Sequence, residues 1–113
     1  MRLFTRTQGI DARSAADLLA AKDAVVVDVR QHEEWQTGHI HDAIHVPLSQ
    51  LSNRQQQLPR GKTIVTVCRS GHRSALAARK LTRAGHDVLN LSGGLNAWAR
   101  AGLPLSPSNA RDK

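Results

Sequence analysis

The sequence has a single cysteine, Cys68, and few aromatic side chains: one Phe, two Trp and no Tyr among 113 residues. One cysteine cannot form an internal disulfide, and a chain of this length can bury enough surface to fold without one. A lone thiol indicates a reducing compartment, in which it is either a small buried hydrophobe or a reactive group. The shortage of aromatic rings leaves no stacking platform for single-stranded nucleic acid.

Long apolar runs are also missing. None approaches the ~18 residues that a membrane-spanning helix needs, and residues 1–8 lack the apolar centre of a signal peptide. We therefore expect a cytoplasmic protein with no membrane partner. At roughly 100 to 200 residues per domain, the chain has room for one domain. We expect that domain to span residues 1–105, and residues 106–113 to form a flexible tail with little to bury.

Acidic side chains are absent from residues 43–86, which hold eight basic ones, whereas residues 1–42 hold five basic and seven acidic ones. The net charge of +7 therefore originates in the middle of the chain. A basic stretch can attract nucleic acid, anionic lipid or small anions. We interpret Arg79, Lys80 and Arg83 as the solvated face of a helix. Because no nucleic-acid recognition motif is present, we expect no nucleic-acid partner and favour a small anion.

Expected strands and helices alternate along the chain. The strands, rich in β-branched apolar residues, are Ala24–Val29, Ile44–Val46, Thr63–Val67 and Asp87–Leu91. The helices are one from Asp11 or Ser14 to Ala21, then Glu33–Gln36, Leu51–Leu58, Ser74–Ala84 and Leu95–Ala101. This order predicts an α/β fold, with a mainly parallel central sheet of about five strands flanked by helices. Ligands bind beyond the carboxyl ends of such strands, and Cys68 follows one of them.

The segment that begins at Cys68 joins a predicted strand to a predicted helix. Gly71 permits the tight curvature with which a loop turns its backbone N–H groups inward to bind an anion. The helix N-terminus, Arg69 and Arg73 add positive charge. Such surroundings lower the pKa of a thiol from ~8.5 toward roughly 3.5 to 7.5. We therefore predict that Cys68 is a thiolate at neutral pH, beside a cradle for an anionic substrate.

Three motifs, in order across residues 10–104, resemble those of rhodanese-like domains. They are Asp28-Val29-Arg30 with Glu34-Trp35, Gly38-His39-Ile40, Ala43 and Val46-Pro47; Cys68-Arg69-Ser70-Gly71-His72-Arg73-Ser74; and Gly93-Gly94 with Trp98 and Gly102-Leu103-Pro104. The chain is similar to a single-domain rhodanese, which is a sulfurtransferase with a catalytic cysteine persulfide. The resemblance implies a rhodanese-like domain over residues 1–105 that works without a cofactor.

The same resemblance implies roles for individual residues. Cys68 would be the nucleophile that becomes the persulfide. The residues that would bind the substrate, through backbone amides and the side chains of the two arginines, are Arg69, Ser70, Gly71, His72 and Arg73. Those that would support this loop are Asp28, Arg30 and Ser74. We interpret Trp35, Trp98 and Pro104 as packing residues.

One segment departs from the family pattern, in which proline and glycine often follow Gly-His-Ile. His41 and Asp42 stand there instead, and we expect Asp42 to bond its own backbone in the turn. His39, His41 and His45 then lie close together in the sequence, and alternating histidines can bind a metal. No cysteine or carboxylate set completes a recognisable ligand spacing, so we expect no metal site.

The implied reaction is a two-step sulfur transfer, in which Cys68 takes a sulfur from a small anionic donor such as thiosulfate and passes it to cyanide or a thiol. One alternative is a persulfide-carrying or interaction module whose donor or acceptor is a protein. Another is a cysteine-dependent phosphatase or arsenate reductase. Such phosphatases place arginine six positions after the cysteine, where this chain has Ser74, and Arg73 comes one residue early.

Overall fold

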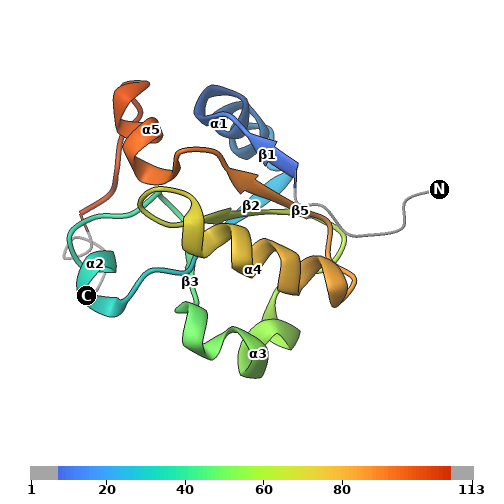
Figure 1. The fold of residues 1–113 in the computed structure, drawn as a ribbon. Helices are drawn as coiled ribbons and strands as arrows, with labels where there is room; N and C mark the ends of the chain where they lie inside the picture. Colours follow the sequence, from blue (N-terminus) through green and yellow to red (C-terminus); the bar gives the residue numbers. More distant parts are fainter. Residues whose placement is uncertain (1–7, 108–113) are drawn as a thin grey trace.

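The computed structural model describes residues 8–107, which form a five-stranded sheet with helices on both faces (Figure 1). The strands are β1 (Gln8–Ile10), β2 (Ala24–Asp28), β3 (Ile44–His45), β4 (Thr63–Val67) and β5 (Val88–Leu91). They lie in the order β1-β5-β4-β2-β3, and each neighbouring pair is parallel. The α/β fold expected from the sequence is confirmed.

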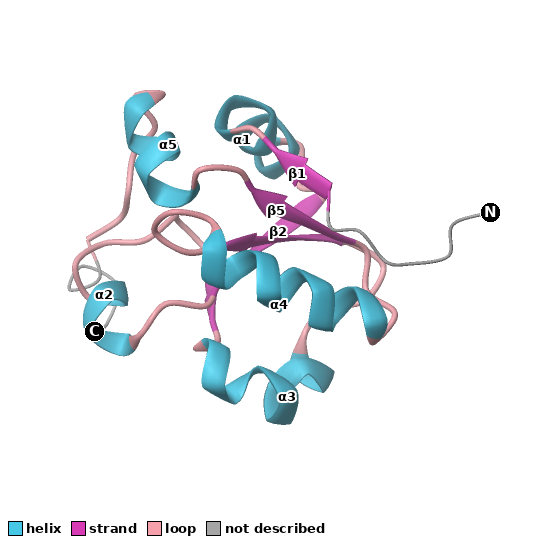
Figure 2. Ribbon diagram, in the orientation of Figure 1, coloured by secondary structure: helices cyan, strands magenta, loops and turns pink. Residues whose placement is uncertain are grey.

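Helices pack on the sheet in two groups (Figure 2). They are α1 (Ala12–Ala20), α2 (His32–Trp35), α3 (Leu51–Arg54), α4 (His72–Arg83) and α5 (Gly94–Arg100). Val27 and Ile64 belong to the core beneath α4, whereas their neighbours Val26 and Val65 belong to the core beneath α1 and α5. Both faces of the central strands are therefore covered, which is why β2 and β4 have apolar residues at consecutive positions, Val25–Val27 and Ile64–Val65, rather than only at alternate ones.

Two elements differ most from the sequence prediction, while others differ by one or two residues at an end, as α4 does in beginning at His72 rather than Ser74. The strand β1 was not predicted, because its three residues have no apolar pattern and are held by parallel pairing with β5. The helix expected over Leu51–Leu58 is shorter: α3 ends at Arg54 and a 3₁₀ turn over Gln55–Gln57 follows. In contrast, β4 has the predicted bounds, and Asp11 rather than Ser14 caps α1.

The turn at Asp42 is built differently from the expectation. The N–H of Ala43 donates to the carbonyl of Ile40 (3.0 Å), and Asp42 itself adopts a left-handed conformation with φ +65°. Its carboxylate lies 3.5 Å from Nε2 of His41 rather than bonding its own backbone. Asp is among the few residues other than glycine that adopt this conformation readily, so the turn forms without the proline and glycine of the family pattern.

The C-terminal part of the described chain is tied back to the domain. The backbones of His39 and Ser106 form an antiparallel bridge through hydrogen bonds of 3.0 and 2.7 Å. The chain is thus held one residue into the tail expected over residues 106–113, of which residues 108–113 lie outside the described residues, as do residues 1–7. None of the described helices is long and apolar enough to cross a membrane.

Candidate active site

The described structure buries Cys68 directly after β4, at the carboxyl end of the strand, with its side chain 1% exposed. Its Sγ accepts hydrogen bonds from the N–H of Gly71 (3.1 Å) and from the N–H and hydroxyl of Ser74 (3.4 and 3.3 Å). Three donors therefore converge on one sulfur atom. Ser74, which the sequence analysis expected only to support the loop, contacts the sulfur directly.

Two opposing effects act on the pKa of the Cys68 thiol. Burial is the largest effect and raises the pKa, because a charge inside the protein loses solvation. Hydrogen bonds from Ser74, Gly71 and Ser70 lower it, and together they hold the pKa of Cys68 below its ordinary value. The direction agrees with the sequence expectation. The groups that lower the pKa are the hydrogen-bond donors of the loop rather than the charged side chains of the two arginines.

The conformation of the Cys68 loop, residues 68–74, depends on Gly71. This residue precedes α4 in a left-handed conformation with φ +106°, which a side chain would strain. A Cβ there would also lie 3.3 Å from the backbone nitrogen of Gly93. The turn directs the N–H of Ser74, in the first turn of the twelve-residue helix α4, toward Sγ, and the helix N-terminus adds positive potential there.

The start of α5 holds the other side of the Cys68 loop. The N–H groups of Leu95 and Asn96 donate to the carbonyls of Cys68 (2.9 Å) and Arg69 (3.0 Å). A Cβ on Gly94 would collide with those same two carbonyl oxygens, so the close approach requires glycine. With its carbonyls bound to α5, the loop can present its N–H groups to the sulfur.

Glu34 of α2 neutralises one of the two arginines of the loop. Its Oε1 and Oε2 accept hydrogen bonds from Nη1 (2.7 Å) and Nη2 (2.9 Å) of Arg73. Nε of Arg69 lies 3.9 Å from Oε2, and the Arg69 side chain is 51% exposed. The hydrogen bonds from Arg73 are the main reason that the pKa of Glu34 is lowered to about 2. The carboxylate is therefore charged throughout the neutral range.

The sequence analysis assigned Glu34 no role. Thirty-nine residues separate it from Arg73, and nothing in the spacing predicts a contact over that distance. One signal was present: the front motif contributes an acidic side chain, whereas residues 43–86 have none. A loop with two arginines and no acid of its own needs a counter-charge from elsewhere.

The segment that carries Glu34 is anchored by Asp28 and Arg30, both 1% exposed. Nε and Nη2 of Arg30 donate to the Asp28 carboxylate (2.9 to 3.1 Å), and Nη2 also donates to the carbonyl of Gly38 (2.7 Å). These bonds close residues 28–38, the β2–α2 segment, into one unit. Among the described residues, the β2–α2 segment is hydrogen-bonded to the side chain of Arg73 in the Cys68 loop through Glu34.

The comparisons with known proteins agree with this geometry. The rhodanese-like domain family matches residues 11–101. The chain belongs to this family. It is 41% identical over 98 residues to a sulfurtransferase of Allochromatium vinosum, which covers 85% of this chain and 92% of that protein. It is 30% identical over 100 residues to the thiosulfate sulfurtransferase GlpE of Vibrio cholerae, which covers 88% and 94% of the two chains.

Comparison with solved structures also identifies the fold as rhodanese-like. A rhodanese-related protein of Thermoplasma volcanium superposes with a TM-score of 0.83 at 30% identity, over 88% of this chain and 98% of that one. The chain therefore matches single-domain rhodanese-like proteins over most of their length. Membership of this family, with relatives named as sulfurtransferases, supports a role in sulfur transfer.

Of the three histidines that lie close together in the sequence, two pack on Trp35 and the third points elsewhere. The rings of His39 and His45 stack on the indole, with centroids 3.5 and 4.6 Å away. His41 is exposed beside Asp42. Within residues 8–107, no three His, Cys, Asp or Glu side chains come together as a metal-binding set. Trp35 has the packing role expected of it, and so does Trp98, which is buried.

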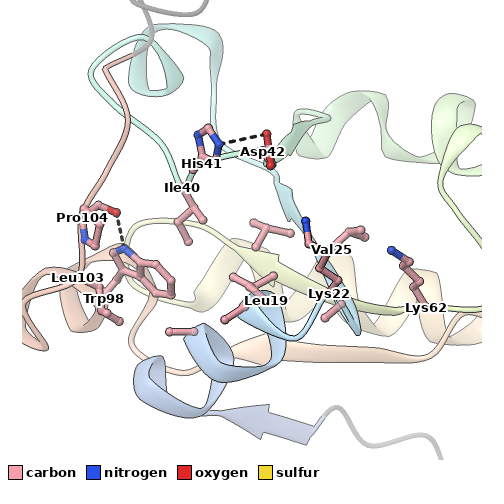
Figure 3. Close-up of a pocket in the computed structure, with 14 residues that line it drawn as sticks. Leu19, Lys22, Val25, Ile40, His41, Asp42, Lys62, Trp98, Leu103 and Pro104 are labelled. Carbon is pink, nitrogen blue, oxygen red and sulfur yellow. Dashed lines mark hydrogen bonds and ion pairs between the residues drawn. The ribbon is translucent and has the colours of Figure 1, made fainter.

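A pocket of about 450 Å³ lies on the α1 and α5 side of the sheet (Figure 3). Leu19, Ile40 and Trp98 contribute apolar walls, and Lys22 and Lys62 stand at its rim. Its volume is within the usual range for small-molecule sites. However, no thiol or hydroxyl side chain lines it. The thiol of the domain, Cys68, lies in the Cys68 loop and not in this pocket.

Proposed function

We propose that this rhodanese-like domain is a thiosulfate-type sulfurtransferase that carries sulfane sulfur as a persulfide on Cys68. The observation that supports the proposal is the convergence of three donors from Gly71 and Ser74 on a buried Sγ. A thiolate stabilised in this way needs no general base before it attacks. The sulfurtransferase names of relatives agree with this chemistry.

In the first step, the Cys68 thiolate attacks the outer sulfur of a donor such as thiosulfate. A bond forms between Sγ and that sulfur, the sulfur–sulfur bond of the donor breaks, and the electron pair leaves with sulfite. Loop amides and the half-exposed guanidinium of Arg69 stabilise the negative charge of the leaving group. Ser70 and His72 lie on the outer side of the loop, bonded to each other (3.1 Å).

In the second step, cyanide or a thiolate attacks the terminal sulfur of the persulfide. Thiocyanate or a new persulfide leaves, and the electron pair of the broken bond returns to Cys68 as the thiolate. No electrons are gained or lost over the cycle, so the scheme needs no redox cofactor. The scheme is a double displacement with a covalent enzyme intermediate.

A second candidate is a persulfide-carrying module with a protein partner, favoured by one observation on α4. Leu76, one turn after His72, is 45% exposed, and the basic side chains of Arg79 and Lys80 are exposed on the same helix. A protein with an acidic, partly apolar surface would fit beside the Cys68 loop. Transfer to such a protein would depend on salt more steeply than transfer from thiosulfate.

The phosphatase or arsenate reductase alternative is disfavoured by the same loop. Three donors already bind one sulfur atom, and position six after Cys68 holds Ser74, whose hydroxyl is one of those donors. An aryl phosphate is therefore expected to show no turnover.

The test of the proposed function is transfer of sulfur from thiosulfate to cyanide. Wild-type protein is expected to produce thiocyanate, and Cys68→Ser is expected to produce none above the uncatalysed rate. Ser70→Ala is a suitable control, because its hydroxyl bonds His72 rather than Sγ. Full activity of Cys68→Ser would overturn the proposal.

A further inference from the structure

The mouth of the candidate active site carries less positive charge than its two arginines alone would give it. Arg69 and Arg73 both stand there, but the Glu34 carboxylate lies between them, bonded to Arg73 at 2.7 and 2.9 Å and 3.9 Å from Arg69. The three side chains together carry a single positive charge. Within residues 8–107, Glu34 is the acidic residue paired with these arginines.

We propose that Glu34 is a specificity-determining residue, which cancels the charge of Arg73 and so reduces the advantage that a doubly charged sulfane donor has over a singly charged one. This inference rests on the proposed function, since it concerns the donor of the same site. Glu34 acts through Arg73 and is therefore a positioning residue, not a group that touches the reacting sulfur.

The carboxylate of Glu34 is fixed in place from several sides. Its Oε1 also accepts a hydrogen bond from the N–H of Gln31 (3.1 Å) at the start of α2. The next residue, Trp35, stacks with the rings of two histidines, and Arg30 ties the end of the segment to Asp28. A donor must therefore bind beside the ion pair, because these contacts oppose displacement of Glu34.

Two donors isolate the effect of charge. Thiosulfate is a dianion and releases sulfite, whereas methanethiosulfonate has a methyl group in place of one charged oxygen, is a monoanion and releases methanesulfinate. In both reactions the Cys68 thiolate forms a bond to the terminal sulfur, the sulfur–sulfur bond breaks and the electron pair leaves with the sulfur–oxygen group. The ratio of kcat/KM for the two donors therefore measures how the site responds to one additional charge.

The chain offers a matched set of variants. Glu34→Gln removes the charge but keeps the size of the side chain. Glu33→Gln removes the same charge from the neighbouring position of α2, where Glu33 is exposed and is not paired with either arginine in the described structure. Glu34→Asp keeps the charge and shortens the side chain. Because both donors are assayed on one sample, their ratio does not depend on how much of a variant is folded.

In Glu34→Gln, the ratio of kcat/KM for thiosulfate to that for methanethiosulfonate is expected to rise roughly 3- to 15-fold at low ionic strength, and less at high salt. Glu33→Gln and Glu34→Asp are expected to keep the wild-type ratio. An unchanged ratio in Glu34→Gln, with both rates falling together, would overturn the inference and indicate that Glu34 only holds α2.

The proposed function is checked on the same samples, through the mass of the protein after each donor. Sulfur added to wild-type Cys68, together with an unchanged ratio, would contradict the role of Glu34 and leave sulfur transfer intact. No sulfur added by either donor would overturn the proposed function, and the inference with it.

Discussion

The Cys68 loop and the β2–α2 segment follow adjacent parallel strands, β4 and β2, and lie at the same end of the sheet, but they are held by different forces. Backbone hydrogen bonds shape the Cys68 loop: Leu95 and Asn96 bind its carbonyls, and Gly71 donates to Sγ. Buried charges shape the β2–α2 segment, through Asp28 and Arg30. The Cys68 loop therefore supplies the hydrogen-bond donors to Sγ. The β2–α2 segment supplies the Glu34 carboxylate, which offsets the charge of Arg73.

We expect the largest loss of unfolding free energy when one of the two buried charges of the β2–α2 segment is removed. Arg30→Leu leaves the Asp28 carboxylate buried without a partner and is expected to cost about 3 to 5 kcal/mol of unfolding free energy. Chemical denaturation measures the loss. In the double variant Asp28→Leu with Arg30→Leu, much of that free energy should return, because no charge is then left unpaired. Equal losses in the single and double variants would contradict the role of the ion pair.

A smaller loss of unfolding free energy is expected at Gly94, where the start of α5 lies against the backbone of the Cys68 loop. Gly94→Ala places a Cβ against the carbonyls of Cys68 and Arg69 in a left-handed conformation with φ +60°, and is expected to cost at least ~2 kcal/mol. Displacement of the loop should also lower kcat/KM for thiosulfate about 100-fold. Gly102→Ala is the control, since Gly102 has φ +78° and no atom near its Cβ position. Equal loss of activity in both variants would contradict the contact.

The smallest effect concerns one hydrogen bond to the sulfur. Ser74→Ala removes the hydroxyl that donates to Sγ at 3.3 Å, and leaves the N–H of Ser74 and of Gly71 in place. Since this bond favours the thiolate, its loss raises the pKa of Cys68. The pH dependence of alkylation should therefore shift to higher pH. Ser70→Ala should shift it less, because the Ser70 hydroxyl bonds His72; equal shifts would contradict the assignment.

The difference between the two regions also explains what could be predicted from the sequence. The Cys68 loop is local: a β-branched strand, a glycine and a helix start follow within a few residues, so the thiol and its cradle were predictable. The pair of Glu34 and Arg73 joins two loops that meet only because β2 and β4 are neighbours, a fact of the sheet order. No local pattern encodes that order.

The same reasoning applies to β1 and to Ser74. The strand β1 exists because β5 offers an edge to pair with, and its own residues have no strand pattern. The hydroxyl of Ser74 was predicted to support the loop, whereas its contact with Sγ depends on how far α4 is turned at its start. Both features are set by packing between elements rather than by the propensity of one segment.

The intact mass of the protein after treatment with thiosulfate measures whether Cys68 accepts sulfane sulfur. Because Cys68 is the only cysteine of the chain, the site of addition is unambiguous among thiols. We expect a gain of one sulfur atom, which cyanide removes and which Cys68→Ser does not acquire. An unchanged mass in the wild-type protein would contradict it.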